Sequence, residues 1–439
     1  MHWFLDMPHS LQAAAILSLF AVAVLLSAPR ASVATVHRLT LLAPIAAALP
    51  ALFQRGPEAF AVLAVLALAL IGALLLCTDA LENPIHRVEC GALLLLGTAG
   101  ACVLATANNL LSILIGFESM SLAVAVMTGL GRGPRTLEVA FKFFALGAAS
   151  VATMIYGIGL VAYAAGSFEI GAAPLAGLTG LHQAGLLLIT LGITYELALV
   201  PIHFGTLGVY FAAPMSFAGF AMTVSKLGAA LAVARLAAAH PHVQPMLVGL
   251  GVLSITWATF GGLAQRHLRG LLAYSAVGHG GFLALSIGCG TDGRTAAVFY
   301  AIVYVASAAL VAAALAGRDG DLPYAELRTE PLGKLRTTAL VTGLLSLSGV
   351  PPSPGFWAKL AVLGPSWHVA GPLLTCIAVL GGVFGALYYL RPVPDLIAGL
   401  RSGERGTAAS RSAGVAIALA GGVTVLFLVL PYLALRLAN

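Results

Sequence analysis

The sequence predicts an all-α polytopic membrane protein with about fourteen transmembrane helices. Of the 439 residues, 60% are hydrophobic and only 9% are charged, whereas a soluble domain carries about 25% charged residues. The mean hydropathy is +1.00. Apolar runs of about 20 residues, enough to cross a bilayer, recur along the whole chain. The sequence lacks the strict polar–apolar alternation that is typical of membrane β-barrels.

Fourteen apolar stretches are long enough to span a membrane. They cover residues 10–28, 38–54, 58–78, 88–107, 109–130, 137–164, 184–204, 207–238, 245–264, 270–289, 295–317, 335–362, 371–390 and 411–435. The start of the chain lacks a basic segment and carries Asp6 before the first apolar run. We therefore expect that run to remain as the first transmembrane helix rather than to be a signal peptide.

The basic residues are unevenly distributed among the loops. Fifteen of the 22 Lys and Arg residues lie in alternate loops, four lie in the other loops, and three lie within spans. By the positive-inside rule the crowded loops are cytoplasmic, so both termini are predicted on the periplasmic side. This topology accounts for the formal net charge of +6, and no nucleic-acid partner is needed to explain it.

Five ionisable residues lie within predicted spans: Glu118, Lys142, Glu196, Lys226 and Lys359. A charge at the centre of a bilayer costs roughly 2.5–3.5 kcal/mol. These groups must therefore pair with each other, become neutral or face water. Lysine is the cation whose protonation responds most readily to burial, whereas arginine stays charged. The pattern favours proton chemistry inside the membrane, with structural ion pairs as the alternative.

Two spans contain prolines that would interrupt a helix. Pro201 follows Glu196 in ELALVPIHFG, and Pro351, Pro352 and Pro354 lie in SLSGVPPSPGFWAKLAV. An internal proline removes a backbone hydrogen bond, and irregular backbone at membrane depth is tolerated where protein buries it or water reaches it. These are the seventh and twelfth spans, which run in opposite directions. Such a pair predicts the inverted repeats of transporters.

Motifs for cofactors and metals are missing from the sequence. The five cysteines are scattered and include no CxxC pair, and no P-loop, H-E-x-x-H or strand-linked G-x-G-x-x-G occurs. We expect no cofactor and no metal in this chain.

Several longer motifs together resemble a known family. They occur in this order: NNLLSILIGFESMSLAVAV from Asn108, EVAFKFFALGAAS from Glu138, VPIHFGTLGVYFAAP from Val200, LLAYSAVGHGGFLALSIG from Leu271, LSLSGVPPSPGFWAKL from Leu345 and GALYYLRPV from Gly385. Over about residues 88–395 the chain resembles the antiporter-like, proton-pumping subunits of bacterial respiratory complex I (NADH:quinone oxidoreductase). Among them it is most similar to the smallest, subunit N.

The resemblance implies fourteen helices, two inverted five-helix repeats, broken helices 7 and 12, and a central hydrophilic axis that carries protons. Residues 1–87 would hold helices 1–3, residues 88–240 the first repeat (helices 4–8), residues 241–392 the second repeat (helices 9–13), and residues 393–439 a loop and helix 14. By position it also implies a proton pathway. Its residues are Glu118, Lys142, Glu196, Lys226, His279 and Lys359, with Tyr195, His203 and Ser225 in support.

The chain departs from the family at Glu196. The family normally has a lysine there, which partners the acid of the fifth helix, and a Trp where this chain has Gly205. Two interpretations follow. Glu196 could take over the relay, in which case we expect it within a few ångströms or one water of Lys142. Alternatively, the subunit has lost pumping and holds its neighbours together.

The resemblance implies a translocase subunit of NADH:quinone oxidoreductase in the bacterial cytoplasmic (inner) membrane, with no redox chemistry of its own. NADH, FMN, iron–sulfur clusters and quinone would belong to partner subunits. The expected partners are other membrane subunits of complex I, especially neighbouring antiporter-like and small membrane subunits, and the lipid bilayer. The alternatives are a subunit of a cation/proton antiporter or membrane-bound hydrogenase complex, and a non-pumping structural subunit.

Overall fold

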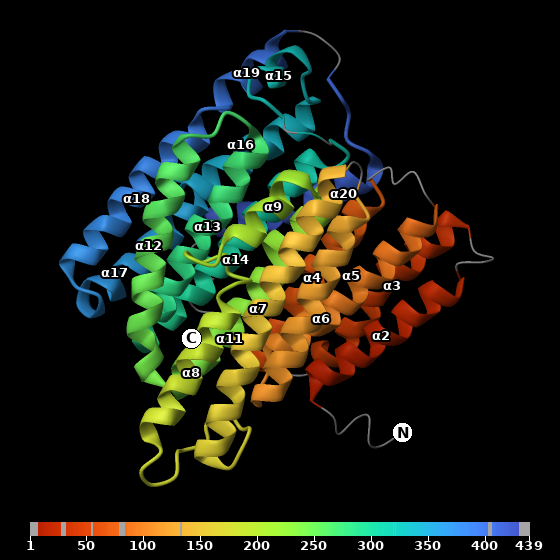
Figure 1. Cartoon of the computed structure of the whole chain (residues 1–439). Coiled ribbons are helices and arrows are strands. Elements are labelled where there is room, and N and C mark those ends of the chain that lie inside the picture. The colour runs from red at the N-terminus through yellow and green to blue at the C-terminus, as the bar shows by residue number, and fades with distance from the viewer. Residues whose placement is uncertain are drawn as a thin grey trace. The chain divides into compact units, whose positions relative to one another are not determined.

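The computed structural model describes residues 8–27, 32–53, 56–78, 84–131, 134–318, 320, 322–402 and 406–429. Over these residues the chain is helical, with isolated bridges and no strand (Figure 1). It divides into two compact units. Unit 1 comprises Met1–Glu196 and Ala212–His242, and unit 2 comprises Leu197–Phe211 and Val243–Asn439.

Unit 1 holds the N-terminal helices and one interrupted helix near its end. Its elements are α2 (His9–Ser27), α3 (Val33–Leu52), α4 (Pro57–Leu76), α5 (Pro84–Ala105), α6 (Leu110–Gly129), α7 (Pro134–Ala165), α8 (Thr179–Ile193), α10 (Met215–Phe220), the π-helix η1 (Ala221–Ser225) and α11 (Lys226–Ala239). Pairs of successive helices, such as α5 with α6 and α7 with α8, pack side by side.

Unit 2 holds the remaining helices. Its elements are α9 (Phe204–Ala212, without its last residue), α12 (Gln244–Leu263), α13 (Leu268–Ile287), α14 (Gly290–Leu315), α15 (Glu326–Thr329), α16 (Lys334–Ser348), α17 (Pro354–Val369), α18 (Pro372–Leu390), α19 (Val393–Arg401) and α20 (Arg411–Val429). The short 3-10 turn η2 (Pro241–Val243) lies at the junction of the two units in the sequence.

Glycines allow close helix contacts in each unit. A Cβ on Gly157 of α7 would lie 2.6 Å from the carbonyl oxygen of Gly185 of α8, and one on Gly251 of α12 would lie 2.7 Å from that of Gly281 of α13. Helices inside a bilayer associate through such close packing, because lipid offers no hydrophobic drive for association. The same device therefore holds a helix pair in both units.

The predicted fold class is confirmed. Twelve helices in the described ranges are long and apolar enough to cross a membrane. The two remaining regions hold the pairs α8/α9 and α16/α17, which are the two spans predicted to be broken. The predicted division of the chain at residues 87, 240 and 392 stays a prediction.

One predicted boundary is wrong. The predicted eighth span, 207–238, begins inside α9, whereas α10 begins at Met215. α10 begins directly after Pro214. Proline is tolerated at a helix start but not within a helix, so α9 cannot continue through Pro214 into α10. The apolar composition runs across this proline without a change, so hydropathy alone does not detect the end of α9.

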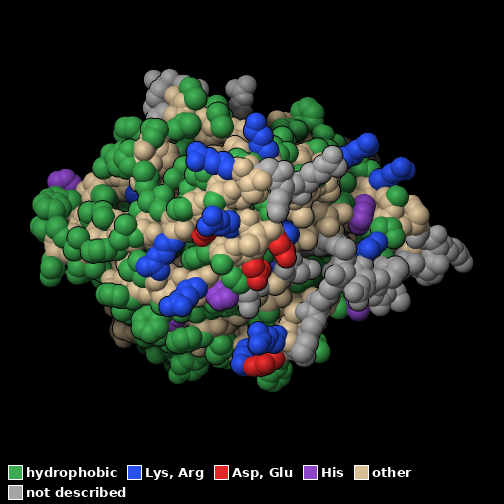
Figure 2. Space-filling view, turned by 90° about the horizontal axis from the view of Figure 1, so that it is seen from above, with side chains coloured by type: hydrophobic (Ala, Val, Ile, Leu, Met, Phe, Trp, Pro, Cys, Tyr) green, Lys and Arg blue, Asp and Glu red, His purple; other side chains and the backbone are tan. Residues whose placement is uncertain are grey.

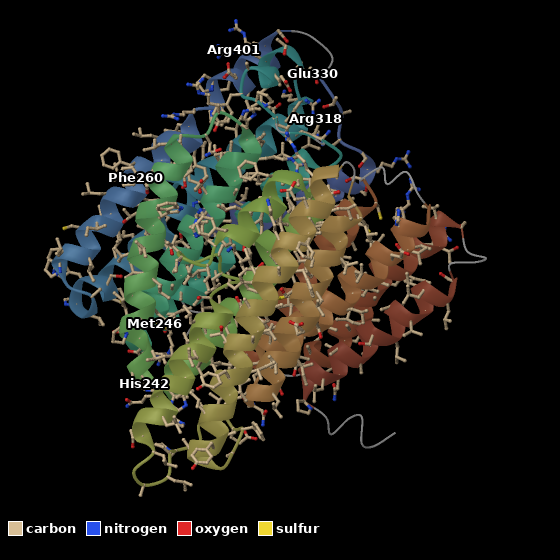
Figure 3. The ribbon with its side chains drawn as sticks, viewed as in Figure 1. His242, Met246, Phe260, Arg318, Glu330 and Arg401 are labelled. Atoms are coloured by element: carbon tan, nitrogen blue, oxygen red, sulfur yellow. The ribbon has the colours of Figure 1, made fainter. Side chains whose placement is uncertain are left out.

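Basic residues gather at one end of unit 2, near α15 and α19. Arg318, Glu330 and Arg401 lie there (Figure 3), and the view onto this end shows Lys and Arg side chains among hydrophobic ones (Figure 2). Arg318 pairs with Glu330 at 3.3 Å. This arrangement is compatible with the positive-inside assignment. The predicted positions of the two termini fall outside the described residues.

Two arginines that the sequence assigned to loops are buried instead. Arg269 is 2% exposed and Arg336 is 5% exposed. Arg336 donates to the carbonyl oxygens of Ala314 and Ala316, and Arg269 donates to that of Arg318 at 3.2 Å. They cap the C-terminal end of α14, where a positive charge stabilises the negative end of the helix dipole.

Candidate functional site

The first helix break occupies residues 194–203, between α8 and α9. Pro201 has no N–H to donate, and Ala198 adopts a left-handed backbone with φ 59°, so the helical ladder stops here. In unit 2 the Val200 N–H donates to Ser254 Oγ at 2.9 Å. In unit 1 the Tyr195 hydroxyl donates to the Phe143 carbonyl at 2.7 Å. Side chains thus take over hydrogen bonds that a continuous helix would make internally.

Unit 1 brings together three of the predicted pathway residues at this break. Glu196 is 4% exposed and Lys226 is fully buried. The Lys226 Nζ donates to the Glu196 carbonyl oxygen at 3.5 Å. The Ser121 hydroxyl hydrogen-bonds to the Glu196 carboxyl, and the charges of Lys226 and Glu118 act on that carboxyl. Glu118 and Ser121 lie three residues apart on α6, so one face of that helix presents both.

The unit 1 cluster, Glu118, Glu196 and Lys226, has two acids and one base. Glu196 Oε1 has no hydrogen-bond partner among the described atoms. A buried polar atom left unsatisfied costs about 1–3 kcal/mol. Two nearby carboxyls also disfavour ionisation of both at once. The cluster therefore can hold one additional proton, and Oε1 is an atom that can carry it.

Lys142 does not join this cluster, so the expected contact between Glu196 and Lys142 is wrong. The Lys142 Nζ lies 2.5 Å from Glu138 Oε1, and its side chain is 65% exposed. The neighbouring Phe143 faces inward, with its ring centroid 5.2 Å from that of Tyr195. Successive helical residues point about 100° apart. With Phe143 turned toward the break, Lys142 is turned away from it.

The length of α7 is a second reason why Lys142 does not contact Glu196. Its 32 residues extend about 48 Å, well beyond the roughly 30 Å of a bilayer's hydrocarbon core. Lys142 is the ninth residue of the helix, about 12 Å from its start. It can therefore reach the polar edge of the membrane, which the sequence alone did not indicate.

The second helix break, in unit 2, separates α16 from α17. Gly349 ends α16 with φ 73°, and Pro354 begins α17. Pro351 and Pro352 lie between them. Lys359 of α17 turns back to the break, where its Nζ donates to the Ser348 carbonyl at 2.6 Å. A Cβ on Gly349 would lie 2.8 Å from Lys359 Cδ, so only glycine leaves room for the lysine side chain.

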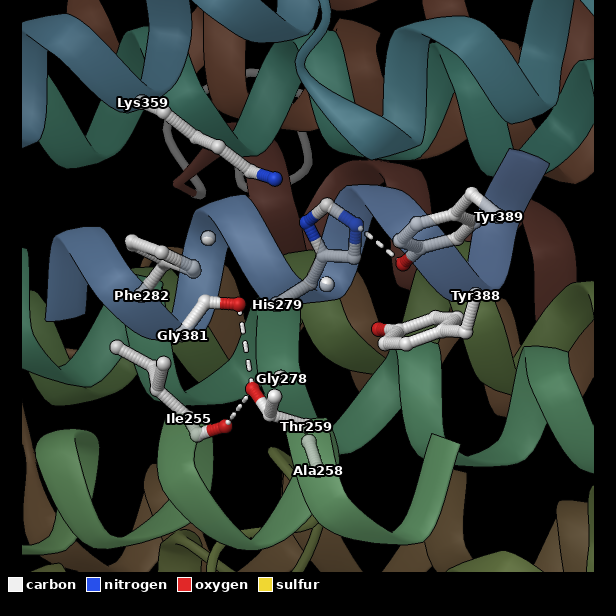
Figure 4. A pocket seen from close by; sticks show the side chains of 12 residues that line it. Ile255, Ala258, Thr259, Gly278, His279, Phe282, Lys359, Gly381, Tyr388 and Tyr389 are labelled. Atoms are coloured by element: carbon white, nitrogen blue, oxygen red, sulfur yellow. Dashed lines mark hydrogen bonds between the residues drawn. The ribbon is translucent and has the colours of Figure 1, made fainter. Parts of the chain in front are cut away.

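His279 of α13 lies close to this lysine in unit 2. A cavity of about 20 Å³ is bounded by Lys359, His279, Thr259, Tyr388 and Tyr389, among others (Figure 4). A cavity of roughly 10–15 Å³ is enough for one water molecule where polar partners are present. Lys359 and His279 can therefore be linked through water.

The His279 ring is held by three tyrosines. Its Nδ1 lies 2.7 Å from the Tyr300 hydroxyl and its Nε2 3.1 Å from the Tyr389 hydroxyl. The Tyr304 ring stacks on the imidazole, with centroids 4.6 Å apart. Both ring nitrogens are thus engaged, and the imidazole sits in a hydroxyl-lined environment.

His203 is buried beside fewer polar groups than His279 is. Its Nδ1 lies 3.3 Å from the Pro201 carbonyl oxygen, and its ring packs against Phe204 and Trp257.

The first break also contacts α13 in unit 2. A Cβ on Gly280 would lie 2.0 Å from the Leu197 carbonyl oxygen, so the break passes directly beside the residue after His279.

Sequence reasoning named the hydroxyl residues Tyr195 and Ser225 but missed three others at the site. Ser121 contacts Glu196 in unit 1, and Tyr300 and Tyr389 contact His279 in unit 2. The signal was available in part, because GALYYLRPV places two tyrosines side by side in an apolar helix. A buried tyrosine hydroxyl usually finds a polar partner.

Comparisons with known proteins agree with this architecture. The family described as "NADH:quinone oxidoreductase/Mrp antiporter, TM" matches residues 107–385. The NADH-quinone oxidoreductase subunit N of Laribacter hongkongensis is 32% identical over 352 residues, which cover 75% of this chain and 71% of that protein.

Solved structures share the fold over nearly the whole chain. A chain of respiratory complex I from Thermus thermophilus, solved with bound aureothin, is 29% identical with a TM-score of 0.82, covering 97% of this chain and 98% of that one. A chain of an archaeal membrane-bound sulfane sulfur reductase has a TM-score of 0.87 at 21% identity, covering 98% and 96%. The second likeness concerns the fold alone.

Proposed function

Because the chain belongs to the NADH:quinone oxidoreductase/Mrp antiporter family of membrane proteins, we propose that it translocates protons as an antiporter-like subunit of a bacterial NADH:quinone oxidoreductase. One observation carries the proposal. In each unit a lysine inside a span donates to a carbonyl at a proline-containing helix break, Lys226 to Glu196 and Lys359 to Ser348. Ionisable residues at membrane depth are expensive and mark ion or proton pathways by default.

In unit 1 the proton would be held by the Glu118, Glu196 and Lys226 cluster. With both acids ionised and the lysine protonated, the cluster carries one net negative charge. Binding one proton makes it neutral, and releasing that proton restores the charge. The change from lysine to glutamate at position 196 then preserves a proton-binding site with a different group.

In unit 2 the proton would be held by Lys359 and passed toward His279. Lys359 is bound by a neutral carbonyl and lies over the Phe282 ring at 5.5 Å. Water in the adjoining cavity supplies the connection to the imidazole, which exchanges protons near neutral pH more readily than other side chains.

The remaining predicted residues take outlying roles in this proposal. Lys142 would act with Glu138 at the edge of the membrane rather than beside Glu196. Tyr195 and His203 would support the backbone of the first break, and Ser225 would support Lys226 from the preceding π-helix. π-Helical turns frequently occur at functional sites.

The other components of the reaction would lie in partner subunits. NADH, FMN, iron–sulfur clusters and quinone are assigned there, and this chain would supply no redox chemistry. Its partners would be neighbouring antiporter-like and small membrane subunits of the complex. We place the chain in the bacterial cytoplasmic membrane, with both termini on the periplasmic side.

A second candidate function rests on Glu196. The family's usual lysine is missing there, so the chain could be a structural subunit that no longer pumps, or could serve a cation/proton antiporter or membrane-bound hydrogenase complex. The buried Lys226 beside Glu196 favours pumping, because a scaffold would gain nothing from a charge in this position that an apolar residue could not give.

The test compares pumping with electron transfer in the assembled complex. Proton uptake into inverted membrane vesicles is measured per electron pair transferred to quinone, together with the amount of assembled complex. Lys359→Met and Glu196→Gln should each lower this ratio, with electron transfer retained, because each variant removes a group that holds the proton. Unchanged ratios in both variants, with normal assembly, would leave only the structural function.

A further inference from the structure

Hydrogen bonds in unit 2 converge on the hydroxyl of Tyr389. This residue is 2% exposed. Its hydroxyl donates to Ser275 Oγ at 2.5 Å, and His279 Nε2 lies 3.1 Å from the same oxygen. Both partners lie on α13, so two polar groups of that helix meet at one oxygen of α18.

The number of available protons fixes the direction of these bonds. A tyrosine hydroxyl has one proton to donate and can accept through its oxygen lone pairs. Because the Tyr389 proton goes to Ser275, His279 donates to the Tyr389 oxygen. His279 is then protonated at Nε2, and its Nδ1 accepts from the Tyr300 hydroxyl at 2.7 Å. All the hydrogen bonds around Tyr389 point toward Ser275.

The same oxygen is connected to Lys359. Tyr388, Tyr389 and Lys359 all bound the 20 Å³ cavity (Figure 4). A water molecule there can accept from the Lys359 ammonium and donate to the Tyr389 hydroxyl. This gives a continuous series of hydrogen-bonding groups from Lys359 through water and Tyr389 to Ser275.

We propose that the Tyr389 hydroxyl is the junction of the proton relay in unit 2, receiving protons from the Lys359 and His279 sides and passing them to Ser275. The proposal rests on the proposed pumping function and adds residues to it. In one transfer, the Lys359 ammonium gives a proton to the cavity water, which gives one to the Tyr389 oxygen.

The transfer then continues by single hops. The original Tyr389 hydroxyl proton moves to Ser275. Ser275 releases its own hydroxyl proton to water at the far end of the series. Each hydroxyl gains one proton and loses one, and Lys359 is left as a neutral amine that must be protonated again.

Tyr304 offers a matched control, because its ring contacts the same imidazole. Tyr304 stacks on His279 at 4.6 Å, but its buried hydroxyl has no hydrogen-bond partner among the described residues. Removing either hydroxyl changes one oxygen atom and leaves the ring in place. Tyr389→Phe and Tyr304→Phe therefore differ only in whether the lost hydroxyl belongs to the hydrogen-bonded series.

The experiment measures protons translocated per electron pair in inverted vesicles that contain the assembled complex. Tyr389→Phe should lower this ratio by the share that this subunit contributes, while electron transfer and assembly are kept. Tyr304→Phe should keep the ratio of the unmodified complex. Equal ratios in Tyr389→Phe, Tyr304→Phe and the unmodified complex would overturn the junction.

Two further variants keep the test decisive. If Tyr389→Phe fails to assemble, Ser275→Ala removes the acceptor of the Tyr389 proton instead and should lower the ratio in the same way. A normal ratio in Ser275→Ala would then count against the junction. Lys359→Met separates a failure of the junction from a failure of the pumping function. If Lys359→Met lowers the ratio and Tyr389→Phe does not, the junction fails while the pumping function stands.

Discussion

The two helix breaks use the same backbone device with different counter-charges. At both, prolines interrupt a span and a lysine donates to a carbonyl at the break, at 3.5 Å for Lys226 and 2.6 Å for Lys359. At the first break the lysine comes from another helix, α11, and two carboxyls lie nearby. At the second it comes from α17 itself, and no carboxylate pairs with it among the residues described.

Under the proposed function, this difference would let the two breaks hold a proton in different ways. An ammonium in a poorly solvated environment is costly unless an opposite charge or several polar groups offset the cost. Carboxylates do so for Lys226, whereas a carbonyl, an aromatic ring and a water-sized cavity do so for Lys359. Unit 1 therefore suits the retention of charge, and unit 2 suits its passage along neutral hydroxyl groups.

The largest expected effect comes from removing the lysine of the first break. Lys226→Met would leave Glu196 and Glu118 buried or half-buried without their cation. Breaking a buried pair by removing one partner typically costs about 3–5 kcal/mol. We expect a marked loss of assembled complex in the membrane, measured by quantitative immunoblotting after native electrophoresis.

Lys142→Met is the matched control for that variant. It removes the same side chain from the same unit, but the Lys142–Glu138 pair is exposed, at 65% and 61% for the two side chains. Exposed pairs contribute little to stability, so assembly should stay near that of the unmodified complex. Equal losses in the two variants would contradict the distinction between the buried and exposed lysines.

A smaller effect is expected at the second break. Gly349→Ala places a Cβ 2.8 Å from Lys359 Cδ, so the lysine side chain must shift from its position at the Ser348 carbonyl. The left-handed backbone adds a cost of roughly 1–2 kcal/mol for any residue other than glycine. We expect fewer protons per electron pair, together with a modest loss of thermal stability of the purified complex.

Gly371→Ala separates these two causes. Gly371 has φ 87°, and a Cβ there would meet nothing within 4 Å. It should therefore reproduce the backbone cost without displacing Lys359. If Gly371→Ala lowers the pumping ratio as much as Gly349→Ala, the lysine's position at the break is not what matters.

Local chemistry explains why the sequence predicted the breaks. Proline cannot continue a helix wherever the rest of the chain lies, so Pro201 and the 351–354 prolines identified both interruptions before any packing was known. The burial of Lys226 and Glu196 followed from their apolar surroundings. The pairing of Glu196 with Lys142 failed because it depended on the rotation of α7, which packing of Phe143 against Tyr195 determines.

The hydroxyl network was beyond sequence reasoning for a related reason. Tyr389 and Ser275 are 114 residues apart and meet only because α18 and α13 fold into one unit. Motif matching supplied His279 and Lys359, since each stands within a motif that resembles the family's. It gave no information on which tyrosine hydroxyl would contact them.

The smallest expected effect sharpens the account of the first break. Ser121 supplies a hydrogen bond to the Glu196 carboxyl. A hydrogen bond to a charged group contributes about 1.5–3 kcal/mol and one to a neutral group about 0.5–1.5 kcal/mol. If Glu196 holds the exchangeable proton, both Ser121→Ala and Glu196→Gln should lower the number of protons per electron pair. The decrease should be severalfold smaller for Ser121→Ala, with assembly unchanged.

Ser119→Ala is the control on the same helix. Ser119 lines a groove formed with α2 and α5, away from Glu196, so its loss should not alter protons per electron pair. The two serines are only two residues apart on α6, and a general weakening of the helix would affect both alike. A reduced ratio for Ser121→Ala alone would indicate that Glu196 works through its hydrogen bond to α6. Identical ratios for both variants would instead leave Lys226 and Glu118 as the groups that govern the Glu196 carboxyl.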